Sequence, residues 1–340
     1  MAEMKKGITF AGTVLVDVVK TVDFYPELGM LANIQSVSQA VGGCVPNTAI
    51  DLATIDPTIP IAAIGKVGKD EYGDFVIAKM QEKGIDTSGV LVSETEPTAF
   101  TDVMNLSSTG ERTFFHCKGT NKNFSPEEIS LDGVDCDILH AGYILLLDKF
   151  DEEDPVYGTG MARFLARVRE RGIRTSVDVT SSKGMDYKKI IGSALPYCDY
   201  IIFNEIECCG IWGIEPYTPE GKVDLAAIER AMRLTLEAGV KEKVIVHCKK
   251  AGFCLDKSGR FTYLTSLDIP RSEIRGSVGA GDAFCAGSLY AIYNGYDDER
   301  ILEFAIAAAS ANLFSENSVD GMRPREELLV LNERYGREAL

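Results

Sequence analysis

A short glycine-rich loop beside an acid is the feature of the sequence that points most directly to chemistry. Residues 275–290 read RGSVGAGDAFCAGSLY, with Gly279, Ala280 and Gly281 immediately before Asp282. Backbone N–H groups at the start of a helix bind developing negative charge, and a carboxylate beside them can take a proton from an attacking hydroxyl. Phosphoryl transfer needs little more than these two functions and an aligned acceptor.

Other kinds of glycine-rich loop fit this stretch less well. A Walker P-loop requires a lysine after its last glycine, and none stands at that place here. A Rossmann loop is followed by a strand that ends in an acid, whereas two helical segments follow this loop near the end of the chain. A tight turn into a closely packed helix is the remaining alternative, because residues 286–291 are mostly small. Of these interpretations, only a phosphoryl-transfer loop assigns a function to Asp282.

The composition narrows the classes of partner. The chain has 340 residues, 45% of them hydrophobic, and 35 Lys+Arg against 51 Asp+Glu give a formal net charge of -16. This charge argues against nucleic acid and anionic membranes as partners. The nine cysteines include no CxxC pair, and the three histidines have no metal-like spacing, so we expect reduced thiols in a cytoplasmic protein. Asp17 interrupts the apolar N-terminal run, and no long apolar stretch follows, so we expect neither a signal peptide nor a membrane span.

The glycine loop must be positioned by a framework of alternating strands and helices. Strands are predicted at 7–17, 59–68, 137–147, 173–179, 200–204 and 243–248, and helices at 46–55, 71–84, 156–172, 225–239, 282–295 and 300–314. This alternation predicts an α/β fold with a mostly parallel central sheet and helices on both faces. Residues 18–41 and 90–118 carry short β-like pieces without helices, with a turn signal at 107–111. They predict a small β insert that projects from the parallel sheet.

Five motifs in order give the chain a family resemblance. The glycine loop at 276–287 is similar to DTxGAGD, and the others are GGCVPNTAIDLA at 42–53, GxxxxD at 12–17, GKVGKDEYG at 65–73 and NEIE at 204–207. Together they resemble the ribokinase-like (PfkB) carbohydrate kinase family. The resemblance implies one ribokinase-like α/β kinase domain over 1–340, with a small β-sheet lid formed by about 18–41 and 90–118.

The resemblance also implies roles for single residues. Asp282 matches the family's catalytic base, and the loop before it, Gly279 to Gly281, matches the anion hole. Asp17, Gly43 and Asn47 match the sugar-binding positions, where a carboxylate and an amide suit the paired donors and acceptors of vicinal hydroxyls.

The cofactors implied by the resemblance are ATP and Mg²⁺. Asn204 and Glu207 match the motif that organises Mg²⁺, largely through water, and the alternative for this pair is a helix capping box. Lys249 and Ser277, with Gly279 and Gly281, are the candidate nucleotide contacts, although Lys249 stands where the family usually has glycine. Gly276 and Ser277 replace the family's Asp-Thr, which leaves activation by a monovalent cation such as K⁺ undecided.

The acceptor is less sharply defined. Lys20 is the only basic residue near Asp17 and residues 42–47, which favours a small neutral sugar. Arg112, on the expected lid, keeps a sugar acid or sugar phosphate open. A nucleoside is a further alternative, because three aromatic residues could stack on a base: Phe24, Tyr25 and Phe115.

A few other polar residues stay open to two interpretations. His116 lies on the expected lid, where it could contact substrate or simply pack. Asp178 ends a predicted strand at the edge where α/β proteins bind ligands, and it could position a ligand or cap a helix. Ser181 and Ser182 follow it, without a His–Asp pattern that would make either a nucleophile.

The resulting hypothesis is an ATP- and Mg²⁺-dependent kinase that phosphorylates a hydroxymethyl group of a small neutral sugar, with Asp282 as general base. The alternatives are a purine nucleoside kinase and a non-catalytic sugar-binding regulator on the same fold. Exposed strand edges of the lid would offer a route to a homodimer.

Overall fold

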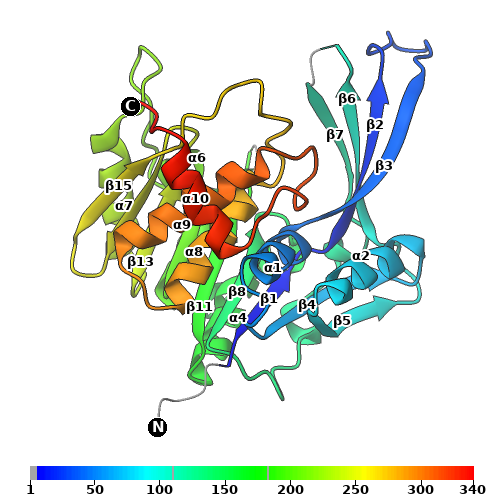
Figure 1. Cartoon of the computed structure of the whole chain (residues 1–340). Helices are drawn as coiled ribbons and strands as arrows, with labels where there is room; N and C mark the ends of the chain where they lie inside the picture. Colours follow the sequence, from blue (N-terminus) through cyan, green and yellow to red (C-terminus); the bar gives the residue numbers. More distant parts are fainter. Residues whose placement is uncertain (1–5, 109–110, 182–183) are drawn as a thin grey trace.

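The computed structural model describes residues 6–108, 111–181 and 184–340. Its main sheet has nine strands: β1 (Ile8–Gly12), β4 (Ile61–Gly68), β5 (Asp86–Ser93), β8 (Ile138–Ile144), β11 (Arg174–Val179), β12 (Tyr200–Asn204), β13 (Lys243–His247), β14 (Ala251–Asp256) and β15 (Phe261–Thr265). Their order across the sheet is β15-β14-β13-β12-β11-β8-β1-β4-β5. The strands from β13 to β5 all pair in parallel. The predicted α/β fold with a mostly parallel sheet is confirmed (Figure 1).

The sheet has an antiparallel edge that the sequence reading did not predict. β13 pairs antiparallel with β14, and β14 pairs antiparallel with β15. These strands are joined by short turns, so no helix separates them and the alternation of strands and helices ends there.

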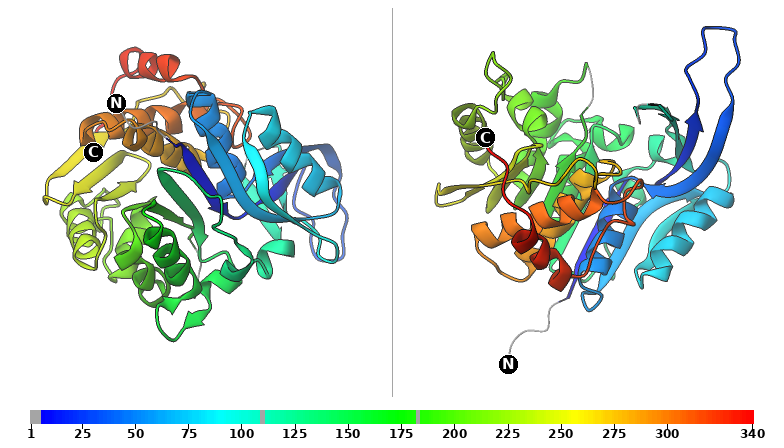
Figure 2. Two further views of the ribbon diagram at one scale, coloured as in Figure 1. Left: turned by 90° about the horizontal axis from the view of Figure 1, so that it is seen from below. Right: turned by 45° about the horizontal axis from the view of Figure 1, so that its top comes forward.

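Helices cover both faces of the main sheet (Figures 1 and 2). One face packs on α1 (Cys44–Ile55), α2 (Glu71–Glu82), α8 (Ala280–Tyr293), α9 (Asp298–Asn312) and α10 (Arg325–Arg334). The other packs on α4 (Gly160–Glu170), α5 (Tyr187–Ala194), α6 (Glu205–Ile211) and α7 (Leu225–Glu237). Short elements complete the chain: α3 (Asp148–Asp151), β9 (Glu153–Asp154), β10 (Gly158–Thr159), and 3₁₀ turns at Gly119–Lys122, Pro126–Glu128 and Leu195–Tyr197.

The two cores follow from strand periodicity. Successive side chains of a strand point to opposite faces, so a strand buried on both faces is apolar throughout. In β1, Phe10 joins the core under α1 and α8, whereas Ala11 joins the core on the other face. In β8, Ile138 and Leu139 divide between the two cores in the same way.

A second sheet of four strands projects from the body and is called the lid sheet here (Figures 1 and 2). It consists of β2 (Leu15–Val22), β3 (Ile34–Gly42), β6 (Ala99–Leu106) and β7 (Arg112–Cys117), in the order β3-β2-β6-β7. β2 and β6 pair in parallel, and the outer pairs are antiparallel. The predicted turn at 107–111 includes residues 109 and 110, which lie outside the described residues.

The boundaries of the lid sheet differ from those predicted. Residues 90–93 belong to β5, which pairs with β4 in the main sheet, and not to the lid sheet. The expected first strand over 7–17 is two strands in two sheets, because the chain leaves the main sheet after Gly12. Gly12 has φ of 144°, and a Cβ there would lie 1.6 Å from the carbonyl oxygen of Gly142. The side chain of Asn121 accepts from the backbone N–H of Val14 over 3.4 Å and donates to the carbonyl of Val14 over 3.1 Å. These two bonds hold the segment that passes from the main sheet to the lid sheet.

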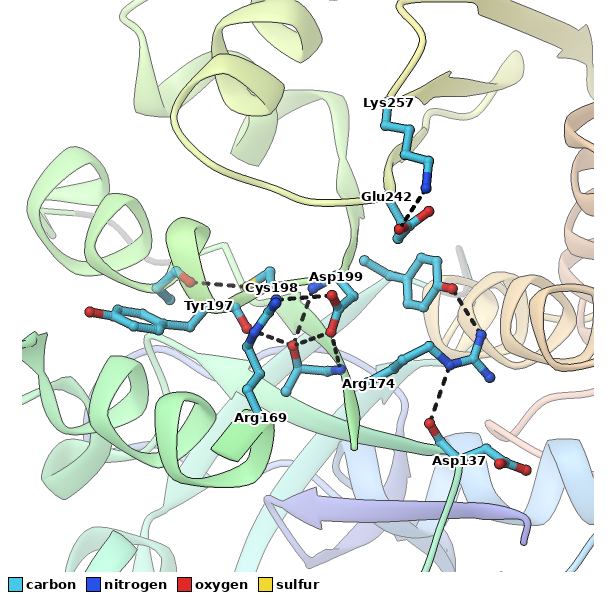
Figure 3. A network of polar contacts seen from close by, with 11 residues as sticks. Asp137, Arg169, Arg174, Tyr197, Cys198, Asp199, Glu242 and Lys257 are labelled. Carbon is cyan, nitrogen blue, oxygen red and sulfur yellow. Dashed lines mark hydrogen bonds and ion pairs between the residues drawn. The ribbon is translucent and has the colours of Figure 1, made fainter. Parts of the chain in front are cut away.

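A polar network joins β11 and β12 near their amino ends (Figure 3). Asp199, just before β12, accepts from the backbone N–H of Thr175 in β11 over 2.8 Å. Arg169 of α4 donates to the other oxygen of Asp199 over 2.9 Å. Arg174 donates to the hydroxyl of Tyr200 over 3.1 Å. These contacts hold β11 and β12 in register, and the register sets where the carboxyl ends of both strands lie.

Candidate active site

The predicted catalytic and metal-binding residues meet at the carboxyl ends of β8, β11, β12 and β13. They line a cavity of about 270 Å³, whose wall includes Tyr143, Asp178, Asn204, Glu207, Gly279 and Asp282. A larger cavity of about 470 Å³ lies between β4, β5 and residues 128–135, and no catalytic or ligand-binding residue predicted from the sequence lines it. Chemistry therefore points to the smaller cavity, at the edge of an α/β sheet where ligands bind.

Asp282 lies in the first turn of α8 and is held at both carboxylate oxygens. Asn47 Nδ2 donates to Oδ2 over 2.8 Å, and the hydroxyl of Tyr143 donates to Oδ1 over 2.5 Å. The pKa of Asp282 is raised to about 7, mainly by burial and to a smaller extent by the negative charge of Asp178, against the hydrogen bonds from Tyr143 and Asn47, which lower it. A general base works best when its pKa is near the operating pH, so this carboxylate is suited to accept a proton.

The glycine loop brings the backbone close to the acid. Gly279 is the N-cap of α8 with φ of 80°, a left-handed conformation that favours glycine. A Cβ at Gly279 would lie 2.7 Å from Cα of Ser318, so a larger residue would push the loops apart. The first-turn N–H groups of α8, at Ala280 and Gly281, belong to the end of a helix that attracts anions. The start of α8 is therefore suited to bind an anion next to Asp282.

The predicted sugar-binding residues come from the base of the lid sheet and the start of α1. Asp17 lies in β2, and burial raises its pKa to about 6, against the hydrogen bond from Thr101 and the charge of Arg112. Gly43 is the N-cap of α1 with φ of 89°, and a Cβ there would lie 2.7 Å from the carbonyl oxygen of Thr13. The negative charge of Asp17 contributes to the raised pKa of Asp282, so the two carboxyl groups share one electrostatic environment.

Arg112 connects the lid sheet to the C-terminal loops. Its Nη2 donates to the carbonyl oxygen of Glu316 over 2.9 Å. Its charge also lowers the pKa of Asp17. Arg112 is therefore beside the predicted acceptor position, although its guanidinium already has a backbone partner.

Asn204 and Glu207 form the capping box that was the alternative for this motif. Asn204 Oδ1 accepts from the N–H of Glu207 over 2.8 Å, and Glu207 Oε2 accepts from the N–H of Asn204 over 2.9 Å. Glu207 Oε1 accepts from Ser181 over 2.9 Å. Burial raises the pKa of Glu207 to about 7, with a smaller contribution from Asp178. Both side chains line the cavity, and a carboxylate, an amide and a hydroxyl are oxygen donors of the kind Mg²⁺ prefers, so the group fits Mg²⁺ held through water.

The remaining predicted residues have weaker connections to the cavity. Lys249 follows β13 and is exposed, and Ser277 is exposed while its carbonyl accepts from the N–H of Ala280 over 3.3 Å. His116 Nδ1 lies 3.0 Å from Thr101 Oγ1 within the lid sheet, and burial lowers its pKa. Ser182 lies outside the described residues.

Two aromatic residues at the site were not predicted from the sequence. Tyr143 holds Asp282 from the end of β8, and the only signal for it is its place at the carboxyl edge of a predicted strand. His247, at the end of β13, packs on Phe284 with ring centroids 4.9 Å apart, and burial lowers its pKa to about 4. A Cβ at Gly281 would lie 3.5 Å from this imidazole, so a neutral His247 lies beside the glycine loop.

Comparison with known proteins agrees with this geometry. The model of the pfkB family of carbohydrate kinases matches residues 5–324. The chain belongs to this family. It is therefore a carbohydrate kinase, of a family that uses ATP. The kinase is 26% identical to a ribokinase of Arabidopsis thaliana over 326 residues, which is 95% of this chain and 80% of the relative.

A second relative and a solved structure extend the comparison. The kinase is 26% identical over 326 residues to an ATP-dependent ribose-1-phosphate kinase of Halopiger xanaduensis, covering 96% of this chain and 98% of the relative. The structure of Arabidopsis thaliana ribokinase complexed with ribose and ATP superposes with a TM-score of 0.78 at 23% identity, covering 96% of this chain and 99% of that one.

Among the described residues of the kinase, no helix combines the length and hydropathy needed to cross a bilayer.

Proposed function

We propose that this kinase transfers the γ-phosphoryl group of ATP to a hydroxymethyl group of a small neutral sugar, with Asp282 as general base. One observation carries the proposal: a buried carboxylate with a pKa of about 7 lies in the first turn of α8, beside the glycine loop. A base and an anion site at adjacent positions are the two functions that phosphoryl transfer to an alcohol requires.

The charges around the acceptor position favour a neutral sugar. Lys20 pairs with Asp102 over 2.5 Å, and Lys118 pairs with Asp148 over 2.5 Å, so these cations are already engaged. Asp17 adds a carboxyl group that would repel an anionic acceptor and would bind hydroxyls. A phosphorylated acceptor, such as that of the Halopiger relative, usually needs several converging cations, and Arg112 is the candidate for such a role here.

In the proposed mechanism, Asp17, Gly43 and Asn47 orient the sugar, and the lid sheet excludes water from it. Asp282 takes the proton of the attacking hydroxyl. The N–H groups at 279–281 stabilise the charge that builds on the phosphoryl oxygens.

Cofactor contacts belong to the same proposal. Lys249 and Ser277, together with the glycine loop, are assigned to the nucleotide, and Asn204 and Glu207 to Mg²⁺ through water. Mg²⁺ in that place supplies positive charge to the transferring phosphates.

A monovalent cation is not part of the proposed mechanism. The family's aspartate is replaced by Gly276, and a Cβ at this position would lie 2.8 Å from the carbonyl oxygen of Ser315. The loop is thus built for glycine and lacks the carboxylate that would hold K⁺. Replacing KCl by tetramethylammonium chloride should change the reaction rate by less than about twofold. A rate lower by more than tenfold would contradict this proposal and indicate a K⁺ site.

We also propose a homodimer that pairs lid sheets, in a cytoplasmic protein with free thiols. β3 is an outer strand of the lid sheet, and its Ile34 and Val37 are more than half exposed. Exposed apolar edge strands favour pairing with a second copy. Light scattering at micromolar concentration should give twice the mass of the 37.1 kDa chain, and a single 37.1 kDa species would contradict the dimer.

A panel assay tests the proposed acceptor. ADP release from ATP and Mg²⁺ would be followed with pentoses, hexoses, sugar phosphates, sugar acids and purine nucleosides. Turnover that is highest with a neutral sugar supports the proposal. A nucleoside or a sugar phosphate as the best acceptor would replace the sugar in it, and folded protein that binds a sugar without turnover would indicate a regulator.

A further inference from the structure

A cysteine, a histidine and an aspartate from three elements meet below the catalytic cavity, on the face of the sheet covered by α1 and α8. Cys44 begins α1, His140 lies in β8, and Asp178 lies in β11. One ligand atom from each of the three residues lies within 4.8 Å of those of the other two. Cys44 and His140 are 0% exposed and Asp178 is 6% exposed. The separation of these residues along the chain explains why no sequence spacing revealed them.

The imidazole of His140 is oriented as a metal ligand would be. Its Nδ1 lies 2.9 Å from Ser176 Oγ, on the neighbouring strand. When Nδ1–H donates to Ser176, the lone pair of Nε2 is left free, and histidine ligands in metal sites are generally fixed by such a bond at the other nitrogen.

The distance from His140 to Asp178 suits a shared cation. Nε2 of His140 lies 3.6 Å from Oδ2 of Asp178, which is long for a hydrogen bond. Nitrogen and oxygen ligands on a tetrahedral zinc ion, each about 2.0–2.1 Å from the metal, are about 3.3 Å apart. A shift of a few tenths of an ångström would bring both atoms onto one ion.

Within the described part of the chain, the buried carboxylate of Asp178 is paired with no lysine or arginine. Its Oδ1 is buried without a partner among the described residues, and the one side chain besides His140 recorded there as interacting with the carboxylate by a hydrogen bond or ion pair is the thiol of Cys44, itself a member of the cluster. The ion pair recorded for Asp178 there is with His140, which carries charge only when protonated. A buried carboxylate in this condition is costly, and a divalent cation would satisfy it.

The backbone leaves space at the cluster and the cavity gives access to it. A Cβ at Gly142 would lie 1.8 Å from Oδ1 of Asp178 and 2.5 Å from Sγ of Cys44, so glycine keeps these atoms within reach of each other. Cys285 of α8 brings a second sulfur to 3.6 Å from Nε2 of His140. This is close to the separation of about 3.5 Å between sulfur and nitrogen on tetrahedral zinc. Asp178 and Cys285 both line the catalytic cavity, which provides an entry path for an ion.

We propose that Cys44, His140 and Asp178 form a binding site for a zinc-class divalent cation, with Cys285 beside the fourth position. A sulfur, a nitrogen and an oxygen ligand suit zinc, whereas Mg²⁺ prefers oxygen alone, so this site is distinct from the one assigned to Asn204 and Glu207. Cys44 binds as a thiolate, and its proton leaves to solvent when the ion enters. The proposal does not depend on the kinase reaction.

Zinc binding by the full-length chain tests the site. The protein would be stripped with a chelator, kept in excess Mg²⁺, and titrated with Zn²⁺ in competition with a chromophoric chelator. We expect one tight Zn²⁺ per wild-type chain and at least about 100-fold weaker binding by Cys44→Ser, because loss of a direct ligand exceeds the effect of losing an outer partner. Cys254→Ser, which changes a buried free cysteine of β14, is the matched control and should bind as the wild type does. Co²⁺ in place of Zn²⁺ should give a thiolate charge-transfer band that weakens in Cys44→Ser alone.

Two results would overturn the proposal. One is a wild-type chain that binds no Zn²⁺ more tightly than about 1 µM, weaker than a thiolate-containing site should be. The other is a Cys44→Ser variant with wild-type affinity. Circular dichroism and a thermal melt would verify that each variant is folded. If Cys44→Ser is not folded, the same titration of Asp178→Asn decides by the same criteria.

Discussion

The hydroxyl of Tyr143 donates to Oδ1 of Asp282 over 2.5 Å, while the Asn47 amide donates to the other carboxylate oxygen, Oδ2, over 2.8 Å. The two donors fix the direction of the carboxylate. They also lower its pKa, whereas burial and the charge of Asp178 raise it to about 7. The base proposed for the reaction is thus held both in place and near neutrality.

Tyr143→Phe should shift the acidic limb of the pH profile. Protonation of Asp282 removes the base, so kcat/KM of the wild type should fall as the pH drops below about 7. The variant loses a hydrogen bond that lowers the pKa of Asp282, so its limb should move to higher pH by about half a unit to one unit. The measurement is kcat/KM against pH for both proteins. A limb that stays in place, or moves to lower pH, would contradict this role of Tyr143.

Asp282→Asn should change how stability depends on pH. In the folded state, burial raises the pKa of Asp282 from 3.8 to about 7, so the folded state favours the protonated form. Protonated Asp282 therefore adds up to about 4 kcal/mol to the free energy of unfolding of the wild type. This contribution is fully present below about pH 4 and is lost as the pH rises to about 7. The amide of the variant does not titrate, so the Tm of the variant should gain a few degrees on the wild type between pH 5 and pH 8. A constant difference in Tm over this range would contradict the raised pKa.

Arg112→Ala should weaken binding of the acceptor more than it slows the chemical step. The change removes the hydrogen bond to the carbonyl of Glu316 and the positive charge near Asp17. We expect KM for the acceptor to rise about tenfold, with kcat changed less than about threefold. The matched control is Arg171→Ala, which likewise removes an arginine bound to a backbone carbonyl, that of Leu131, far from the cavity. Equal effects of the two variants would remove Arg112 from the acceptor site.

Glu207→Gln should raise the Mg²⁺ concentration needed for half-maximal activity by about tenfold, because a neutral amide holds the hydrated ion less well. Glutamine can still accept from the backbone of Asn204, so the capping box should survive. The control is Glu128→Gln in the other capping box, formed with Ser125 and remote from the cavity. The same Mg²⁺ requirement in both variants would show that Glu207 acts only as a cap.

Local sequence patterns predicted the elements of the main sheet well. Each of its parallel strands except β5 was expected from a buried apolar run, and α1, α2, α7, α8 and α9 lie within a few residues of their expected positions. The pattern could not show that residues 7–17 divide between two sheets. The break depends on Gly142 and Asn121, which come from distant parts of the chain.

The motif residues at the cavity were predicted from their order along the chain, and the contacts among them were not. Gly279 and Asp282 are close in sequence, so their proximity was certain. Tyr143 reaches Asp282 only because β8 and α8 pack against each other. No local sequence pattern predicts this tertiary contact. Asn47 was assigned to the sugar, and the structure shows in addition that it donates to Asp282.

In the proposed mechanism, Asp282 is the base that deprotonates the acceptor. The most direct test is a single-turnover, rapid-quench measurement of phosphoryl transfer by Asp282→Asn and wild type, using the best acceptor from the panel. For Asp282→Asn we expect a rate of transfer lower by about 10²–10⁴-fold, with the affinities for ATP and acceptor retained within a few-fold. A variant that is folded, saturated with both substrates and as fast as the wild type would contradict it.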